Sequence, residues 1–138
     1  AFGAVGAMMA CYDEALSYAS ERKQFSRPIA GYQLVQNKLA TMVTEITKAQ
    51  LLCLQLGRLK EADTVRPQQI CLAKRNNVYW AREIARMGRD ILGANGVTND
   101  YQCGRHMLNI ESVYTYEGTH DIHTLVIGND VTGLNAFE

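Results

Sequence analysis

The amino-acid sequence predicts an all-α fold, a four-helix bundle, on three observations. First, apolar residues recur every three or four positions over long stretches, which is the period of an amphipathic α-helix. Second, no stretch alternates apolar and polar residues as a half-buried β-strand would. Third, short segments containing proline or glycine separate the periodic stretches. With 138 residues the chain forms one domain that can bury a core, and helices joined by loops of this length pack as a bundle.

The first predicted helix runs through about Glu21, and the second is the longest. In the first helix the residues at helical spacing are Val5, Met8, Tyr12, Ala15, Leu16 and Ala19. The segment Ser26-Arg27-Pro28 interrupts the pattern, because proline disfavours helical geometry in the residue before it. In the second helix apolar residues step by three and four along one stripe, as in a bundle: Val35, Leu39, Met42, Ile46, Ala49, Cys53 and Leu56.

Two further helices are predicted in the second half of the chain. Pro67 fits the first turn of the third helix, whose small residues, such as Gly88, allow a neighbouring helix to approach closely. This helix ends at Gly93-Ala94-Asn95-Gly96, where glycines favour left-handed geometry. Residues 99–115 are predicted to be irregular or partly helical. The fourth helix follows Thr119, a suitable N-cap, with Asp121 in its first turn.

The composition argues against several classes of partner. Lysine and arginine together number 14, as do aspartate and glutamate, so the formal net charge is zero and a nucleic-acid partner is not expected. No apolar run approaches the roughly 20 residues that a membrane span needs. The apolar stretch Ala1–Ala10 has no basic segment ahead of it, so a signal peptide is not predicted. A soluble protein is the expectation.

The four cysteines are expected to be free thiols. Cys11, Cys53, Cys71 and Cys103 form no close pair in the sequence, and no histidine stands at ligand spacing from them. A metal site is therefore not predicted. Buried free thiols are typical of proteins in a reducing compartment.

The candidate chemistry lies just before the last helix, in Tyr116-Glu117-Gly118-Thr119-His120-Asp121-Ile122-His123. Glu117 is expected on a tight turn, next to backbone N–H groups that lack partners at the helix start. Such N–H groups can bind an oxyanion. A carboxylate beside them fits abstraction of a proton alpha to a carbonyl, because the N–H groups would stabilise the developing enolate. The alternative is an ordinary turn into a helix.

Three other helix ends carry candidate binding residues, each with a structural alternative. Arg22 and Phe25 fit either phosphate recognition or a basic helix end with a hydrophobic cap. Gln33 fits either hydrogen bonding to a base edge or a helix cap. The segment Asp90–Gly96 fits either close approach of a ligand or a plain glycine stop. Structural or surface roles are expected for the histidines His106, His120 and His123.

Taken together, these segments resemble the C-terminal helical domain of the acyl-CoA dehydrogenases over about Ala4–Phe137. The landmarks occur in the family's order: Glu21-Arg22-Lys23-Gln24-Phe25-Ser26-Arg27-Pro28-Ile29, Tyr32-Gln33-Leu34-Val35-Gln36, Gly93-Ala94-Asn95-Gly96 and Thr115-Tyr116-Glu117-Gly118-Thr119. Within the family the glutaryl-CoA branch is the most similar, on Leu56-Gly57-Arg58-Leu59-Lys60, Lys74-Arg75-Asn76-Asn77, Asn109-Ile110-Glu111-Ser112-Val113 and His120-Asp121-Ile122-His123.

The resemblance implies a role for each site residue. Glu117 matches the catalytic base that removes the alpha proton of an acyl-CoA thioester while hydride leaves Cβ for flavin N5, and Tyr116 and Gly118 match positions at the substrate. The implied cofactor is FAD. Positions that match its contacts are Arg22, Phe25, Gln33, Asp90, Ile91, Leu92, Gly93, Ala94, Thr119, Asp121 and Phe137. In the family a neighbouring subunit supplies several of these, so a homo-oligomer, a dimer of dimers, is implied.

The resemblance also implies a parent enzyme. It would oxidise glutaryl-CoA to glutaconyl-CoA, decarboxylate that product to crotonyl-CoA and pass electrons to an electron-transfer flavoprotein. Residues 1–138 would form its C-terminal domain, inactive without the family's N-terminal helical and middle β-domains. The bacterial cytoplasm or the mitochondrial matrix is the expected location. Two alternatives stay open: a related acyl-CoA oxidase that passes electrons to oxygen, and a non-catalytic, self-associating helical bundle.

Two residues depart from the family pattern. Ser26 stands where the family usually has glycine, which is a mild change if the φ angle there is negative. Ala94 stands where many members have a second glycine. That methyl group would weaken FAD binding if the backbone has a positive φ or must lie close to the diphosphate.

Overall fold

The structure, a computed structural model, describes residues 1–137. The all-α prediction is confirmed, with five α-helices in the described residues: α1 (Phe2–Glu21), α2 (Gln33–Glu61), α3 (Pro67–Ile91), α4 (Gln102–Thr115) and α5 (His120–Thr132). Between them lie two-residue strands and two 3₁₀ turns: β1 (Lys23–Gln24), β2 (Arg27–Pro28), η1 (Ile29–Gly31) and η2 (Gly93–Val97).

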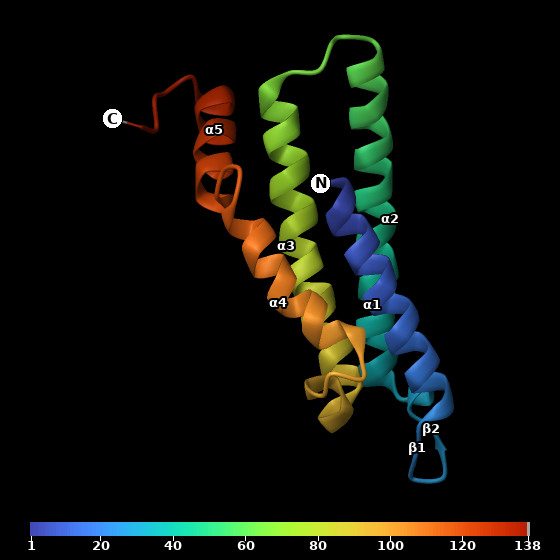
Figure 1. The fold of residues 1–138 in the computed structure, drawn as a ribbon. Helices are drawn as coiled ribbons and strands as arrows, with labels where there is room; N and C mark the ends of the chain where they lie inside the picture. Colours follow the sequence, from blue (N-terminus) through green and yellow to red (C-terminus); the bar gives the residue numbers. More distant parts are fainter. Residues whose placement is uncertain (138) are drawn as a thin grey trace.

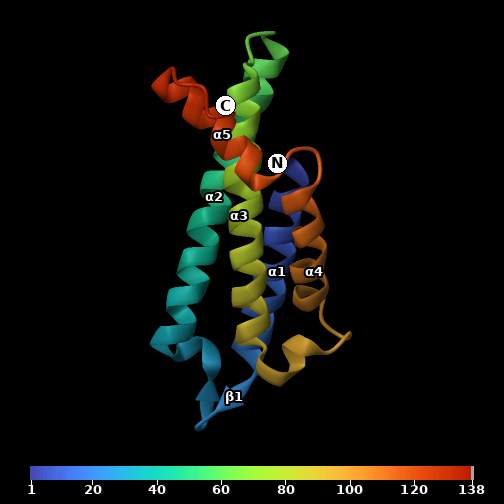
Figure 2. The same ribbon diagram turned by 90° about the vertical axis from the view of Figure 1, so that its left-hand side faces the viewer.

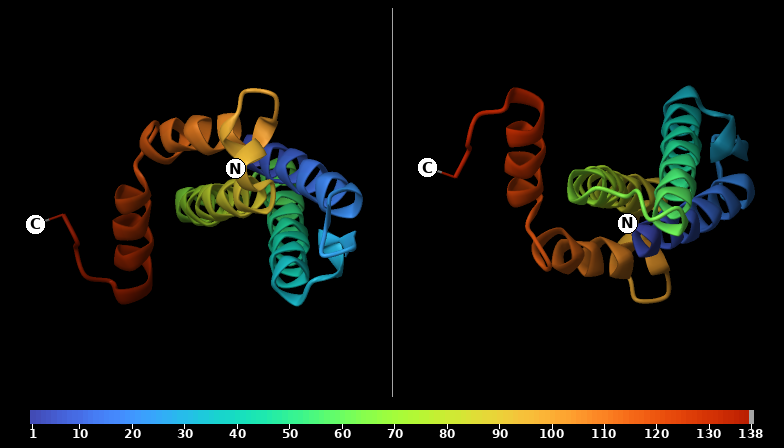
Figure 3. Two further views of the ribbon diagram at one scale, coloured as in Figure 1. Left: turned by 90° about the horizontal axis from the view of Figure 1, so that it is seen from below. Right: turned by 90° about the horizontal axis from the view of Figure 1, so that it is seen from above.

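Helices α1 to α4 form the bundle, and α3 is its central element. Helix α3 packs against α1, α2, α4 and α5 (Figure 1). The core of the bundle contains the largest fully buried side chains, which include Met8, Met42, Ile84 and Leu92. Helix α5 stands apart from the other four and packs on α3 alone among its main contacts (Figure 3). The molecule is therefore a four-helix bundle that carries a fifth helix at one end.

The connection between α1 and α2 is a small β-hairpin, which the sequence did not predict. Lys23 pairs with Pro28 and Gln24 with Arg27. The two residues at the tip, Phe25 and Ser26, have φ angles of 50° and 69°, as a two-residue hairpin turn with left-handed residues requires. The φ of Ser26 is therefore positive, so the condition under which this departure from glycine would be mild is not met. A non-glycine residue in this region costs about 1–2 kcal/mol.

Helix α4 lies in residues 99–115, which the sequence predicted to be irregular or partly helical, and it is longer and more regular than expected. It is a regular helix whose local sequence offers no side-chain cap. The cap comes from α1 instead: the Glu14 carboxylate accepts hydrogen bonds from the backbone N–H of Gln102 at 2.8 Å and of Cys103 at 2.8 Å. This carboxylate satisfies N–H groups that have no partner within the helix.

Glycines allow the helices to approach closely near the end of α3, as the small residues there predicted. A Cβ built on Gly88 would lie 2.6 Å from the Sγ of Cys103 on α4. A Cβ on Gly96 would collide with the backbone carbonyl oxygen of Arg89. Larger side chains at these two positions would force α3, η2 and α4 apart.

Four free cysteines occur in the structure, and three of them are buried. Across residues 1–137 no group of three or more metal-ligating side chains comes together. The same residues hold no helix whose length and apolar character would suit a membrane span.

Candidate functional site

The turn that carries Glu117 joins α4 to α5 and has an unusual backbone. Glu117 has a φ of 50° and Gly118 a φ of 92°. A left-handed glutamate is uncommon, and strained residues of this kind concentrate at functional sites. The Glu117 side chain is exposed to solvent in this chain. The turn therefore presents the carboxylate outward on a backbone that its surroundings must hold in place.

Helix α5 begins as the sequence predicted. Thr119 is its N-cap, and the Thr119 Oγ1 accepts a hydrogen bond from the N–H of Ile122 at 3.2 Å. Asp121 lies in the first turn. Within residues 1–137 the N–H groups of Glu117, His120 and Asp121 form no hydrogen bond. Backbone donors at the Glu117 turn and at the start of α5 therefore remain available to a ligand.

Lys74, on α3, binds the backbone of the turn. Its Nζ donates a hydrogen bond to the carbonyl oxygen of Gly118 at 2.7 Å and also contacts those of Tyr116 and Glu117, the latter at 3.4 Å. The same ammonium lies 5.4 Å from the centroid of the Tyr116 ring. Burial lowers the pKa of Lys74, and the negative charge of Glu117 acts in the opposite direction. In the sequence Lys74 belongs to a segment that is similar to the glutaryl-CoA branch, and no role was predicted for its side chain.

Two histidines pack under the turn. His123 is 8% exposed, and neither of its ring nitrogens has a hydrogen-bond partner in residues 1–137. Burial is the main cause that lowers the pKa of His123, followed by the positive charge of Lys74. His120 stacks on Tyr114 with ring centroids 4.6 Å apart, and burial lowers its pKa too. Both rings are part of the packing between α3, α4 and α5.

A second group of predicted residues meets at the end of α1. Arg22 and the segment 91–94 line one pocket of about 350 Å³, together with Tyr18 and Asn95. The Arg22 guanidinium has no acidic partner in the part of the chain that the structure describes. The side chains of Ile91 and Leu92 belong to the core, so these two residues offer backbone rather than side chain to the pocket. In this segment Gly93, not Ala94, has the positive φ.

Phe25 and Gln33 line a neighbouring groove of about 830 Å³. Gln24 and Ile29 border both the pocket and the groove. Phe25 is 89% exposed at the hairpin tip, which is unusual for a large apolar side chain. The two cavities make one continuous surface around the hairpin.

Two predicted residues lie outside both groups. The Asp90 carboxylate is paired with Lys38 on α2 and with Arg89 at 3.1 Å, and its hydrogen bond with Lys38 is the main cause that lowers its pKa. Phe137 lies in the tail after α5, 54% exposed, and its N–H donates to the Asn135 side chain at 3.0 Å.

The two groups lie at opposite ends of the molecule. The hairpin and η2 are at one end of the bundle, and the turn with Glu117 is near the other, beside the start of α1 (Figures 1 and 2). Helix α1, with 20 residues, spans roughly 30 Å between them. A single chain therefore does not bring Arg22 and Glu117 to one site.

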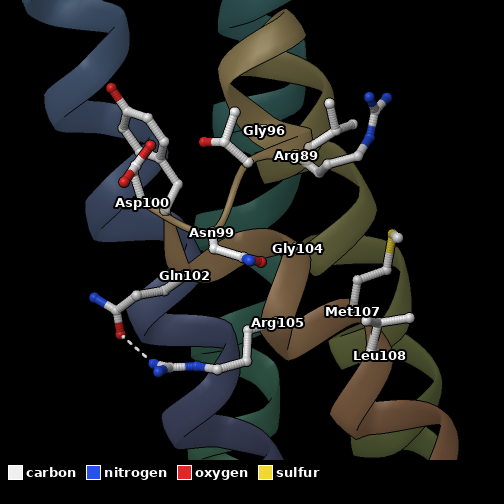
Figure 4. Close-up of a pocket in the computed structure, with 12 residues that line it drawn as sticks. Arg89, Gly96, Asn99, Asp100, Gln102, Gly104, Arg105, Met107 and Leu108 are labelled. Carbon is white, nitrogen blue, oxygen red and sulfur yellow. Dashed lines mark hydrogen bonds between the residues drawn. The ribbon is translucent and has the colours of Figure 1, made fainter.

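A third pocket, of about 660 Å³, opens between η2 and α4 (Figure 4). Gln102 and Arg105 at its rim share a hydrogen bond of 3.2 Å. Gly96 is the one residue of the predicted segment 90–96 that lines this pocket, and none of the residues matched to FAD or to the substrate does.

The chain is similar to known proteins over nearly its whole length. The family model described as "Acyl-CoA dehydrogenase, C-terminal domain" matches residues 1–132. A crystal structure of glutaryl-CoA dehydrogenase from Mycobacterium smegmatis shares 53% sequence identity with a TM-score of 0.98, over 99% of this chain and 35% of that one. A glutaryl-CoA dehydrogenase from the same organism, solved in complex with FADH2, shares 47% identity with a TM-score of 0.97, over 99% and 36%.

Curated relatives are similar to the chain at lower identity. Glutaryl-CoA dehydrogenase from Desulfococcus multivorans is 30% identical over 135 residues, which are 97% of this chain and 35% of that protein. The chain spans about a third of the length of the curated relatives that it matches. On the family match and these identities, the chain belongs to the acyl-CoA dehydrogenase family, as its C-terminal domain.

Proposed function

We propose that this chain is the C-terminal domain of an FAD-dependent dehydrogenase that acts on glutaryl-CoA, with Glu117 as the catalytic base. The observation that carries the proposal is the turn itself. It holds a carboxylate in a strained backbone beside the unpaired N–H of the same residue. The similarity to two glutaryl-CoA dehydrogenases, at 53% and 47% identity, supports the substrate.

The residues of the turn would divide the work of proton abstraction. The Glu117 carboxylate takes the alpha proton of the thioester. The Glu117 N–H donates a hydrogen bond to the thioester carbonyl oxygen, which gains negative charge as the proton leaves. Tyr116 and Gly118 flank the acyl group, and the absence of a side chain at Gly118 lets the substrate approach the backbone. When bound, the flavin supplies the acceptor for the hydride that leaves Cβ.

The surface around the hairpin suits FAD. Arg22 is an unpaired guanidinium over a pocket with exposed backbone at Gly93 and Ala94, and a guanidinium can bind a diphosphate through two hydrogen bonds. Gln33 and the exposed Phe25 ring border the adjoining groove, where they can contact the adenine. Thr119 and Asp121, which lie at the opposite end of the molecule, would also contact an FAD. Because one chain keeps these two sets of residues apart, one cofactor would draw them from two copies, as a dimer of dimers does.

The parent enzyme would contain N-terminal helical and middle β-domains besides this one. Its products would be crotonyl-CoA and carbon dioxide, and its electron acceptor an electron-transfer flavoprotein. Its location would be bacterial or mitochondrial, as for the relatives in Desulfococcus multivorans and in plant mitochondria.

The Glu117→Gln variant of the full-length enzyme tests the base. The variant should keep its flavin. The rate at which glutaryl-CoA reduces that flavin in the absence of oxygen, monitored by flavin absorbance, should fall by at least about 100-fold. Glu61→Gln, at an exposed carboxylate near the end of α2, is the control and should react like the wild type. A Glu117→Gln enzyme that is reduced at the wild-type rate would rule out this residue as the base.

The same preparation separates the dehydrogenase from an oxidase. Peroxide formed in air at the rate of substrate loss would assign the protein to the oxidases. Turnover that requires an electron-transfer flavoprotein supports the dehydrogenase.

A further inference from the structure

Lys74 is an unusual residue to find beneath the Glu117 turn. It comes from the first half of α3, 43 residues before Glu117 in the sequence. A lysine at a helix surface ordinarily extends into solvent or pairs with a carboxylate. The Lys74 ammonium does neither: it is half-buried and forms no ion pair with a carboxylate within residues 1–137.

The Lys74 ammonium is instead directed at backbone. An ammonium has three hydrogens to donate, and the Nζ of Lys74 reaches the carbonyl oxygens of Tyr116, Glu117 and Gly118. These carbonyls follow the C-terminal end of α4, where the helix dipole favours a positive charge. One side chain therefore binds the carbonyl oxygen of Glu117 and those of both its neighbours in the sequence.

The turn needs such support because its backbone is strained. Glu117 and Gly118 occupy the left-handed region in succession. A residue in such a conformation persists only when neighbouring groups hold it there. Thr119 caps the helix that follows, but it makes no hydrogen bond to the carbonyl groups of Tyr116 or Glu117. Lys74 supplies the missing restraint.

We propose that Lys74 is a positioning residue that fixes the location of the catalytic base by binding the carbonyl oxygens of the turn that carries it. The inference rests on the proposed function, in which Glu117 removes the alpha proton. Lys74 touches neither substrate nor the transferred proton. It sets where the Glu117 carboxylate and N–H stand relative to the thioester, and its positive charge lies close to that carboxylate.

Other charged or titratable groups also surround Lys74. They are the Glu117 carboxylate, the His123 imidazole on α5, the Cys71 thiol on α3 and the α-amino group of Ala1. Of these, only Glu117 carries a negative charge at neutral pH and lies on the turn. Glu117 is therefore the one acidic group of the turn that lies beside the Lys74 ammonium.

The test compares Lys74→Met and Lys74→Arg in the full-length holoenzyme, with Lys60→Met, at an exposed lysine near the end of α2, as the control. Lys74→Met should lower the limiting rate of flavin reduction by about 10- to 100-fold, because a small displacement of a reacting group is enough for that. KM should change much less. Lys74→Arg should restore part of the rate, because a guanidinium can still bind the carbonyl oxygens of the turn.

Hydrogen exchange of the substrate-free holoenzyme provides a readout that does not depend on activity. Lys74→Met should speed exchange in the peptide containing residues 116–123, while flavin content and the exchange of α1 and α2 stay as in the wild type. Faster exchange with an unchanged rate of flavin reduction would make Lys74 a structural residue only and overturn the inference.

Two failures can be told apart. A wild-type enzyme whose flavin no acyl-CoA thioester reduces would overturn the proposed function and this inference with it. A wild-type enzyme that is reduced, alongside a Lys74→Met variant reduced equally fast, would overturn the inference alone.

Discussion

Gly118 faces the imidazole ring of His123, and no side chain fits between them. A Cβ built on Gly118 would lie 2.8 Å from Cε1 and 3.0 Å from Nε2 of that ring. The φ of 92° at Gly118 is also unfavourable for any other residue. The ring of His123 is buried and cannot move into solvent without opening the contact between α3 and α5. Gly118 is therefore required by the backbone and by its neighbour at once.

The Gly118→Ala variant should therefore lose both stability and catalysis. We expect a loss of about 1–3 kcal/mol in unfolding free energy, measured by denaturant titration, and a large fall in flavin reduction by the full-length enzyme. Gly128→Ala is the matched control, because it lies in α5 with nothing within 4 Å of its Cβ position. It should be neutral or stabilising, since alanine is the better helix former. Equal behaviour of the two variants would contradict the account of the turn.

Stability should fall as the pH drops below about 6.5. The pKa values of His123 and His120 are lowered from 6.5 in the folded chain, chiefly by burial. In the unfolded chain they are not lowered, so below that pH the unfolded state binds more protons and is favoured. The unfolding free energy, measured between about pH 7 and pH 5, should therefore decrease as the pH falls. The slope of unfolding free energy against pH should be smaller in a His120→Gln, His123→Gln double variant.

His106→Gln removes a histidine on α4 that lies outside this cluster and is the control for the pH experiment. It should leave the slope as in the wild type. A double variant with the full wild-type slope would place the pH sensitivity in other groups.

The long-range cap on α4 should contribute measurably to stability. Glu14→Ala leaves the N–H groups of Gln102 and Cys103 without their acceptor, and we expect a loss of about 1–2 kcal/mol. Asp13→Ala, at the exposed neighbouring position, should change the unfolding free energy by less than about 0.5 kcal/mol. Equal losses in the two variants would mean that the carboxylate of Glu14 is not an effective cap.

Arg22→Ala should weaken FAD binding by the full-length protein. Loss of a charged hydrogen bond to the diphosphate corresponds to a rise of about 10- to 100-fold in Kd, measured by flavin fluorescence on titration of the apoprotein. Arg58→Ala removes an exposed guanidinium from α2 and should leave Kd unchanged. An unaltered Kd in Arg22→Ala would remove this residue from the cofactor site.

The features that the sequence predicted are those with local causes. The periodic apolar residues of α1, α2 and α3 and the N-cap of Thr119 are visible in short windows of sequence, and those elements lie where they were expected. Helix α4 was predicted only as an irregular or partly helical segment, because its cap, Glu14, lies 88 residues before Gln102. The role of Lys74 was not predicted either, because Lys74 lies 43 residues before Glu117.

The resemblance carried part of the site and left part of it open. It matched both Arg22 and the segment 90–94 to FAD contacts, and Arg22 lines one pocket with residues 91–94. It gave no reason to expect the positive φ of Glu117, because that angle depends on how α3, α4 and α5 meet. The FAD roles of all these residues remain predictions, and Asp90 and Phe137 lie in neither the pocket nor the groove around the hairpin.

The attachment of α5 determines how this domain would fail on heating. Each helix of the four-helix core has at least two packing partners, whereas α5 depends mainly on α3. Elements with few partners open at lower free energy than the whole domain. The residue proposed as the base sits at the joint between the two, so detachment of α5 would displace Glu117 while the core stays folded. Inactivation would then precede melting, and any surface that covers α5 in an assembly would protect activity without raising the melting temperature of the core.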